Sequence, residues 1–321
     1  MITSTEFLQN LNIEAKKYYD LSINDNIERS DIWKSNFDGL KYHINSNESP
    51  IDKISDILST QFFSSGIFNK DVTKNEIVYC IEYLKDNYDL NIEDFLKENI
   101  TESIFSNHDK LILFDNKHYI SSDYFRHLFA ILEIKKYCNL NIDDRLNIVE
   151  LGSGIGALGR IFKLMFSNSK YFFIDIPESL YYAFLYIRLN FPDKKYKYIT
   201  SNDKININED IDFYFIPAKY IESIYNNKFD VFINECSMGE MNQKTLDSWF
   251  DFIQNKILVD YFYNFNRYYD DERSNAYLAY DNKWELLHED INPKYNEIPN
   301  HPYGKYLSIT HNFEKITKRI H

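Results

Sequence analysis

Three glycines at alternate positions form the part of this sequence best suited to holding a ligand. Gly152, Gly154 and Gly156 follow an apolar run at 146–151 that predicts a strand, and they lead into a predicted helix over 156–166. Because glycine has no Cβ atom, such a loop can turn sharply and its backbone can approach a ligand closely. The amides at the start of the helix favour a negative group such as a carboxylate. This unit predicts a ligand site at the carboxyl end of a parallel sheet.

The acidic residues around the loop help to distinguish S-adenosylmethionine from a dinucleotide as its ligand. The glycines alone leave two interpretations, because Gly152-x-Gly154-x-x-Ala157 also fits the dinucleotide fingerprint. Glu150, just before the loop, favours S-adenosylmethionine, since a carboxylate there attracts a cationic methionyl amine and repels a pyrophosphate. Asp175, at the end of the second predicted strand, suits both ligands because it can accept hydrogen bonds from two ribose hydroxyls.

We therefore predict S-adenosyl-L-methionine as the cofactor, with an NAD-dependent oxidoreductase as the alternative. The predicted cofactor contacts are Glu150, Gly152, Ser153, Gly154, Gly156, Asp175, Ile176, Asn234 and Glu235.

Polar side chains that could serve a methyl acceptor follow the predicted strand at 229–234. Methyl transfer from a sulfonium is an in-line displacement, and an alcohol acceptor must lose its proton near the transition state. Glu240 is our candidate for the general base, and the alternative is a carboxylate at a helix N-terminus that faces solvent. Glu235 could act instead, or it could orient the methionyl amine. Ser237 could touch the substrate or cap the next helix.

Basic residues and histidines supply further candidates. Arg267, after the next predicted strand, could clamp a phosphate of a nucleotide sugar or form a surface ion pair with Asp270 or Asp271. His301 in a proline-flanked loop, and His127 on the helix before the first strand, could each supply the base, although a lone histidine is more often structural.

Two arginines lie where a cofactor could be reached. Arg126 and Arg160 could each bind the cofactor carboxylate or lie on a solvated helix face. No cluster of cysteine, histidine and aspartate has the spacing of metal ligands, so we predict no metal.

The overall composition narrows the class of partner. The chain has 321 residues and a formal net charge of −13, which argues against non-specific nucleic-acid binding because an acidic protein repels phosphate backbones. Its three scattered cysteines predict reduced thiols in a cytoplasmic protein. We expect neither a signal peptide nor a membrane span, since no apolar stretch approaches the required length. A small-molecule substrate is the expected partner.

Predicted strands and helices alternate in the second half of the chain. Strands are expected over 146–151, 171–175, 196–200, 212–216, 229–234 and 259–264, and helices over 156–166, 178–189 and 245–256. This alternation predicts a parallel sheet with helices on both faces. Two further strands, over 284–288 and 306–313, have no helix between them. They predict an antiparallel pair that finishes the sheet, which a standard dinucleotide fold lacks.

The first 120 residues have a different pattern. Apolar residues spaced by three and four predict helices over 6–21, 51–63, 74–85 and 92–104. Residues 111–120 suit either a small hairpin or a loop. A helix over 124–138, capped from 121–123, follows. We place a domain boundary here, with a helical N-terminal region over 1–120 and a second domain over 121–321.

In its second domain, over about 120–321, the chain resembles the class I S-adenosylmethionine-dependent methyltransferases. It more specifically resembles the sugar O-methyltransferases of bacterial surface-polysaccharide gene clusters. The segments that carry the resemblance are 148–159, 174–178, 191–192, 234–241 and 263–267. The first is general to methyltransferases, whereas the Asp-Ile-Pro-Glu and Ser-x-x-Glu-Met steps are more particular.

This resemblance implies an α/β fold with a Rossmann-like seven-stranded sheet and S-adenosylmethionine as methyl donor. It also implies a sugar hydroxyl of a nucleotide sugar or polysaccharide precursor as acceptor, and a lid over the substrate cleft formed by residues 1–120. A phosphate derivative or an amine as acceptor stays open.

Overall fold

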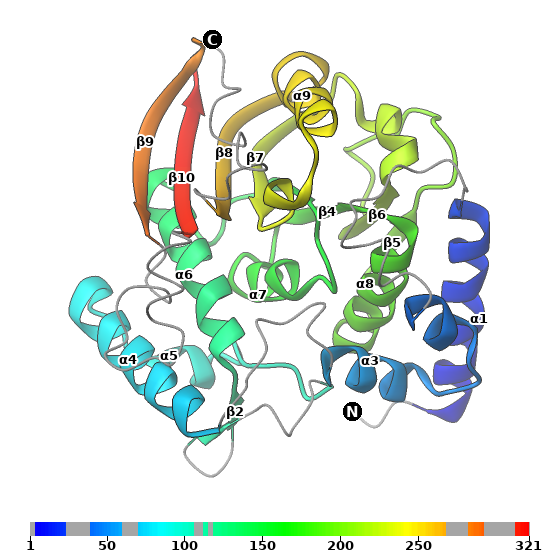
Figure 1. Cartoon of the computed structure of the whole chain (residues 1–321), viewed down its shortest axis with the longest axis horizontal. Coiled ribbons are helices and arrows are strands. Elements are labelled where there is room, and N and C mark those ends of the chain that lie inside the picture. The colour runs from blue at the N-terminus through cyan, green and yellow to red at the C-terminus, as the bar shows by residue number, and fades with distance from the viewer. Residues whose placement is uncertain are drawn as a thin grey trace.

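A computed structural model of the chain describes residues 4–23, 39–59, 70–105, 112–114, 118–267, 282–291 and 312–320. Most of its strands form one eight-stranded sheet in the order β5-β6-β4-β3-β7-β8-β10-β9 (Figure 1). These strands are β3 (Asn147–Leu151), β4 (Lys170–Asp175), β5 (Tyr196–Tyr198), β6 (Phe213–Pro217), β7 (Lys228–Glu235), β8 (Leu258–Arg267), β9 (Trp284–Ile291) and β10 (Asn312–Arg319).

The sheet is parallel from β5 to β8 and antiparallel at its other end. β10 pairs antiparallel with β8 on one side and with β9 on the other. The predicted Rossmann-like α/β fold and its antiparallel finish are confirmed. The sheet has the eight strands that the pattern predicts rather than the seven that the resemblance implies, because the short strand β5, predicted over 196–200, pairs parallel with β6 as an additional edge.

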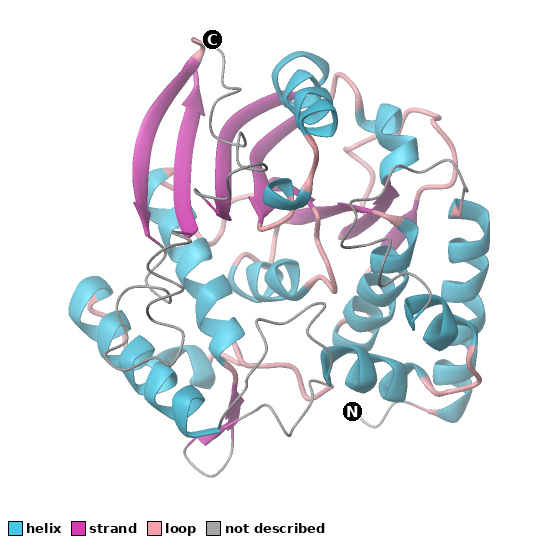
Figure 2. Cartoon of the chain, in the orientation of Figure 1, coloured by secondary structure: helices cyan, strands magenta, loops and turns pink. Residues whose placement is uncertain are grey.

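Helices cover both faces of the sheet, as Figure 2 shows. On one face lie α6 (Ser122–Tyr137), α7 (Ala157–Met165) and α8 (Pro177–Asn190), within one buried apolar cluster. On the other lie α9 (Gln243–Asp251), a π-helical turn over Phe252–Lys256 and the 3₁₀ helix η2 (Ala218–Ile224), within a second cluster. β3 is buried at four of its five positions and β6 at every position, and β6 is apolar throughout because both faces of the sheet are covered.

The described N-terminal helices divide into two groups. α1 (Thr5–Ser22) and α3 (Pro50–Ser59) pack against α8, and α4 (Lys70–Tyr88) packs against α6, with α5 (Ile92–Lys97) nearby (Figure 1). Each group is joined to the core by buried polar contacts. Lys53 Nζ on α3 donates to the Tyr181 hydroxyl on α8 at 3.0 Å, and Tyr88 on α4 bonds Glu133 on α6.

Several N-terminal predictions can be compared with the structure. A hairpin is present, since β1 (Ile112–Phe114) pairs antiparallel with β2 (His118–Ile120). The helix predicted over 92–104 was too long. It ends at Lys97 because Asn99 adopts a left-handed φ of 61°. The Ile100 amide then donates a hydrogen bond to the Phe95 carbonyl, which closes the end of the helix. Residues 60–63 and 306–311 of two predicted elements lie outside the described residues. The domain boundary at 120 stays a prediction.

Candidate active site

The three glycines of the loop between β3 and α7 all have a positive φ, a backbone conformation that glycine adopts more easily than any other residue. Their φ angles are 74° at Gly152, 54° at Gly154 and 83° at Gly156. A side chain in this left-handed region costs about 1–2 kcal/mol per residue. Gly156 is the N-cap residue of α7, directly before its first residue, Ala157. The sequence-based interpretation of the loop as a sharp strand-to-helix turn is confirmed.

Gly152 has a second reason to be glycine. A Cβ atom built there would lie 2.1 Å from the hydroxyl oxygen of Ser237, which follows β7. The Ser237 hydroxyl donates to the Leu151 carbonyl at 3.2 Å, and the Asn234 side-chain amide donates to the same carbonyl at 2.8 Å. Ser237 caps no helix with its side chain. It instead fastens the segment after β7 directly onto the glycine loop.

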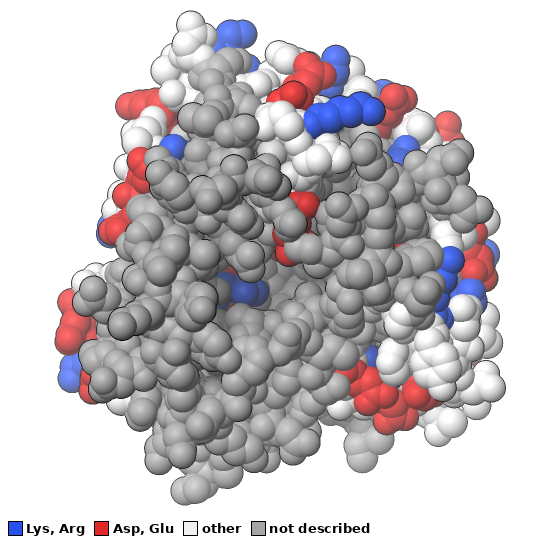
Figure 3. Space-filling view, in the orientation of Figure 1, with Lys and Arg blue, Asp and Glu red and all other residues white. Residues whose placement is uncertain are grey.

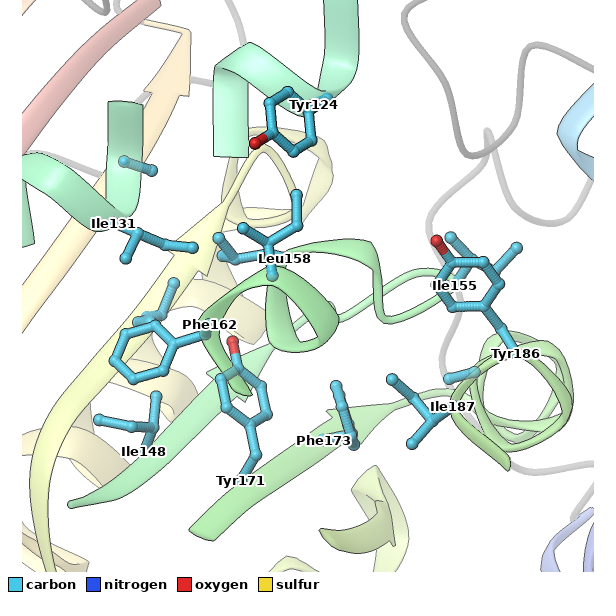
Figure 4. Packing of buried hydrophobic residues seen from close by; sticks show 14 of the residues in the cluster. Tyr124, Ile131, Ile148, Ile155, Leu158, Phe162, Tyr171, Phe173, Tyr186 and Ile187 are labelled. Atoms are coloured by element: carbon cyan, nitrogen blue, oxygen red, sulfur yellow. The ribbon is translucent and has the colours of Figure 1, made fainter. Parts of the chain in front are cut away.

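Gly159, one turn into α7, allows the helix to lie close to the sheet. A Cβ atom there would lie 2.4 Å from an edge carbon of Phe173 and 2.7 Å from Tyr171, both on β4. Figure 4 shows these two rings projecting from the strand towards α7. The close approach fixes the start of α7, and hence the loop, relative to β4.

Asp175 closes the loop from the neighbouring strand. One carboxylate oxygen accepts from the Gly154 amide at 2.8 Å, and the other accepts from the Ile176 amide at 2.7 Å. Burial raises the pKa of Asp175 to about 7, although these two bonds favour its ionised form. The Ser179 side chain also favours the ionised form, and because a carboxylate offers about four acceptor sites, Asp175 can still accept from a ribose hydroxyl.

Ser153 lies at the tip of the loop with only 6% of its surface exposed. Its hydroxyl has no hydrogen-bond partner among the residues that the structure describes. Buried hydroxyls are normally bonded, so this one suits a contact with a bound ligand.

Glu150 lies beneath the loop. Its carboxyl group is 2% exposed and accepts a hydrogen bond from the Tyr171 hydroxyl at 2.9 Å. Burial raises the pKa of Glu150 well above the usual carboxyl range. Glu150 therefore has a partner inside the protein, and its predicted contact with a methionyl amine stays a prediction.

Glu235, the last residue of β7, meets two residues of α6. Its carboxylate lies 2.7 Å from Arg126 Nε and 2.9 Å from His127 Nδ1. Burial alone would raise its pKa, but the adjacent Arg126 and His127 outweigh that effect and hold the pKa of Glu235 at about 2. Neither Arg126 nor His127 lies on a solvated helix face, because their side chains are 14% and 7% exposed.

Three buried asparagines hold the segment that follows β7. The Asn234 carbonyl oxygen accepts from the Asn266 amide at 2.7 Å and from the Met238 backbone amide at 3.2 Å. The Asn266 carbonyl oxygen accepts from the Gly239 amide at 2.8 Å, and the Asn266 amide also bonds Asn264. The 3₁₀ turn η3 (Met238–Glu240) is thereby fixed against β8, and Glu240, at its end, is partly exposed. Sequence reasoning missed Asn264, although an Asn-x-Asn pattern at a strand end was a visible signal.

The remaining predicted residues fall elsewhere. Arg160 is buried and binds the Asn190 side chain at 2.7 Å and the Thr101 carbonyl at 2.6 Å, so it joins α7 to α8 and to the N-terminal region. Neither of its two predicted roles fits this arrangement. Arg267 ends β8, opposite Asn312, and its side chain lies outside the described residues. His301 also lies outside them.

Among the described residues, one group lies close enough together to hold a metal ion, namely His43, Glu48 and Asp56 in the N-terminal region, and it shares no residue with the glycine loop. Within the described ranges, the helices are all too short or too polar to cross a membrane.

Near the centre of this face, over the region where α6 and α7 lie in Figure 1, Figure 3 shows atoms of a lysine or arginine with acidic atoms above them. The glycine loop, Glu235 and Asn234 thus stand at the carboxyl ends of β3 and β7, where parallel sheets bind ligands.

Comparison with known proteins gives a likeness of fold only. No family model matches the chain, and no curated protein is significantly similar in sequence. Similar solved structures include the pyocyanin biosynthetic protein PhzM, at 11% identity and a TM-score of 0.39, over 60% of this chain and 55% of that one.

Two other similar structures are methyltransferases by name. Magnesium protoporphyrin IX methyltransferase from Synechocystis, solved with bound SAM, has 9% identity and a TM-score of 0.39, over 76% of this chain and 97% of that one. An S-adenosylmethionine-dependent methyltransferase from Clostridium acetobutylicum has 13% identity and a TM-score of 0.41, over 61% and 92%. These similarities are too slight to assign an activity, which must be argued from the site itself.

Proposed function

We propose that the protein is an S-adenosylmethionine-dependent methyltransferase. The observation that carries this proposal is the left-handed glycine loop closed by Asp175 through the Gly154 amide, at the carboxyl ends of β3 and β4. Such a loop offers backbone close to a ligand, and Asp175 offers acceptors for its ribose. S-adenosylmethionine would supply the methyl group as a sulfonium. Ser153, Asp175 and Ile176 would hold it at the loop.

Two features favour this cofactor over NAD. Three acidic residues, Glu150, Asp175 and Glu235, surround the loop, and Glu235 is ionised. The ionised Glu235 repels a pyrophosphate, and a cationic amine and sulfonium beside Glu150 and Asp175 would lower the raised pKa values of these two carboxyl groups, so the surroundings suit a cationic ligand. The second feature is β10, which runs antiparallel between β8 and β9, where a dinucleotide fold continues its parallel sheet.

For the acceptor we propose a sugar hydroxyl of a nucleotide sugar or surface-polysaccharide precursor. The proposal is supported by the resemblance of 234–241 to sugar O-methyltransferases and by the asparagine contacts that make this segment rigid beside the glycine loop. Glu240, Ser237 and Arg267 are the proposed substrate-side residues, with His301 as a further candidate base. We also propose that the N-terminal helices border the acceptor site, since they pack on α6 and α8 to either side of α7.

Calorimetry tests the cofactor. The protein should bind S-adenosylmethionine and S-adenosylhomocysteine and should not bind NAD. Asp175→Ala should weaken binding at least tenfold, because it removes the ribose acceptors and the Gly154 contact. Asp210→Ala is the matched control, since the Asp210 side chain is 93% exposed and pairs only with the exposed Lys195 among the described residues. Binding of NAD without S-adenosylmethionine would refute the proposal.

A methyl-transfer screen tests the acceptor. Nucleotide-linked hexoses, sugar phosphates and amines would each be incubated with S-adenosylmethionine labelled in its methyl group, and products read by mass spectrometry. Label in a base-stable ether on the sugar ring is the expected product. Label on a phosphate oxygen or an amine would replace the sugar hydroxyl while leaving the cofactor assignment intact.

A further inference from the structure

We infer that His127 is the catalytic base of the proposed methyl transfer and that Glu235 positions it. This inference rests on the proposed function and replaces Glu240, the base favoured by the sequence. The contact that supports it joins α6 to the end of β7, two elements that lie far apart in the chain.

The contact fixes which nitrogen of His127 can accept a proton. His127 Nδ1 lies 2.9 Å from a carboxylate oxygen of Glu235, and both side chains are nearly buried. Because Glu235 is ionised it can only accept, so Nδ1 must carry the hydrogen. Nε2 is then the accepting nitrogen, and its lone pair faces a guanidinium nitrogen of Arg126 at 3.4 Å, a long contact that the acceptor hydroxyl must replace before the imidazole can act as a general base.

His127 and Glu235 also lie close to the glycine loop. Glu235 follows Asn234, whose side chain bonds the Leu151 carbonyl at the start of the glycine loop. His127 stands in the second turn of α6, which packs against α7, the helix that the loop begins. Both residues therefore lie at the carboxyl edge of the sheet, beside the site proposed for the sulfonium.

The charges around His127 balance the step. The groups that face the pair in the described structure are Arg126 and Asp123 on α6 and Glu150 on β3. Arg126 binds Glu235 and places one guanidinium nitrogen 3.4 Å from His127 Nε2. Glu235 offsets the charge that the imidazole gains, and Arg126 holds that carboxylate ionised, whereas the guanidinium charge beside Nε2 opposes its protonation until the acceptor hydroxyl displaces it.

The proposed step is a single displacement. The acceptor hydroxyl gives its proton to His127 Nε2 while its oxygen forms a bond to the methyl carbon. The carbon–sulfur bond breaks, and its electron pair stays on sulfur. The products are a methyl ether, S-adenosylhomocysteine and a protonated His127, which returns its proton to solvent. An imidazole suits this role better than a partly exposed carboxylate, because its ordinary pKa lies nearer neutral pH.

The first test is independent of the acceptor. Nitrogen-15 NMR of the imidazoles in the full chain, with S-adenosylhomocysteine bound, should show His127 at pH 8 as the Nδ1–H tautomer. Calorimetry on the same sample reports cofactor binding separately, so failure of the proposed function is recognised by itself. A His127 that carries its hydrogen on Nε2 at pH 8 would overturn the inference.

The second test uses methyl transfer to a mixture of UDP-, GDP- and dTDP-linked hexoses. His127→Gln should bind S-adenosylmethionine within threefold of wild type and lower kcat about 10²–10⁴-fold, the usual contribution of a positioned base. Glu235→Gln should lower kcat and move the acidic limb of the pH–rate profile to lower pH, since the imidazolium loses its counter-charge. His43→Gln, in the N-terminal region, is the matched control.

Two outcomes of the second test contradict the inference. One is wild-type turnover in His127→Gln together with loss of turnover in Glu240→Gln. The other is a pH–rate profile that Glu235→Gln leaves in place, which would mean that Glu235 only holds α6 to the sheet.

Discussion

Replacing Gly152 by alanine tests whether Ser237 or the backbone angle makes glycine necessary at this position. The new Cβ atom would lie 2.1 Å from the Ser237 hydroxyl oxygen, on a residue with a φ of 74°. The left-handed angle costs about 1–2 kcal/mol, and the overlap adds about 1–3 kcal/mol, as overpacked cores do. The free energy of unfolding of Gly152→Ala should therefore fall by about 2–5 kcal/mol.

A double-mutant cycle separates the two costs. Ser237→Gly removes the atoms that the new Cβ meets, at the expense of the hydroxyl's bond to Leu151, about 0.5–1.5 kcal/mol. In the double variant only the cost of the backbone angle should remain from the alanine. The two substitutions should therefore couple favourably, by about 1–3 kcal/mol.

Urea unfolding followed by circular dichroism measures all four proteins. Gly39→Ala is the matched control, because a Cβ atom there meets nothing within 4 Å and its φ is not left-handed. It should be neutral or stabilising, by up to about 1 kcal/mol. A Gly152→Ala variant as stable as wild type, or a cycle without coupling, would refute the placement of Ser237 over the loop.

Three further predictions concern α7, Asp175 and Lys53. Gly159→Ala should lower the free energy of unfolding by about 1–3 kcal/mol, because the methyl group meets Phe173, and urea unfolding should show recovery with Phe173→Leu. Since the folded pKa of Asp175 is raised to about 7, the folded state keeps a proton that the unfolded chain loses near pH 4. Stability should thus fall as pH rises from 4 to 7, a fall that Asp175→Asn should reduce but not abolish, because Glu150 also has a raised pKa; an undiminished fall in Asp175→Asn would exclude Asp175 as a source. Burial lowers the pKa of Lys53 to about 8, so stability should rise with pH between 8 and about 10 as the folded state sheds a proton first. Urea unfolding of Lys53→Met should show a smaller rise, and an unchanged one would contradict this interpretation.

The fold was largely predictable because the hydrophobic pattern of many of its elements fits either a strand or a helix and not both. β6 is buried at every position and reads as a continuous apolar run, whereas α1 repeats its apolar residues at helical spacing. The last strand, predicted over 306–313, was given too early an end, because β10 continues to Arg319. Glu314 is almost fully buried and bonds the Tyr263 hydroxyl at 2.9 Å, so a charged residue occupies an inward position and hides the alternation.

The candidate site was predictable in part. The glycine loop and Asp175 carry local signals, since glycine spacing and an acid at a strand end are visible in the sequence. The contact of Glu235 with Arg126 and His127 carries no local signal, because it depends on how α6 lies across the sheet. The fit of Ser237 over Gly152 was hidden for the same reason, and Arg160 gave no sign that its partners are Asn190 and Thr101.

The place of β10 between β8 and β9 has a consequence for how the chain is made. During synthesis β9 emerges from the ribosome before the strand that will pair with it, since β9 in the sheet order contacts β10 alone. Until residues 312–319 emerge, β8 presents an open edge and β9 has no partner. Open edges invite pairing with other chains, so a stalled or shortened nascent chain should aggregate through β8. The sheet that holds the cofactor loop is thus complete only after translation has passed β10.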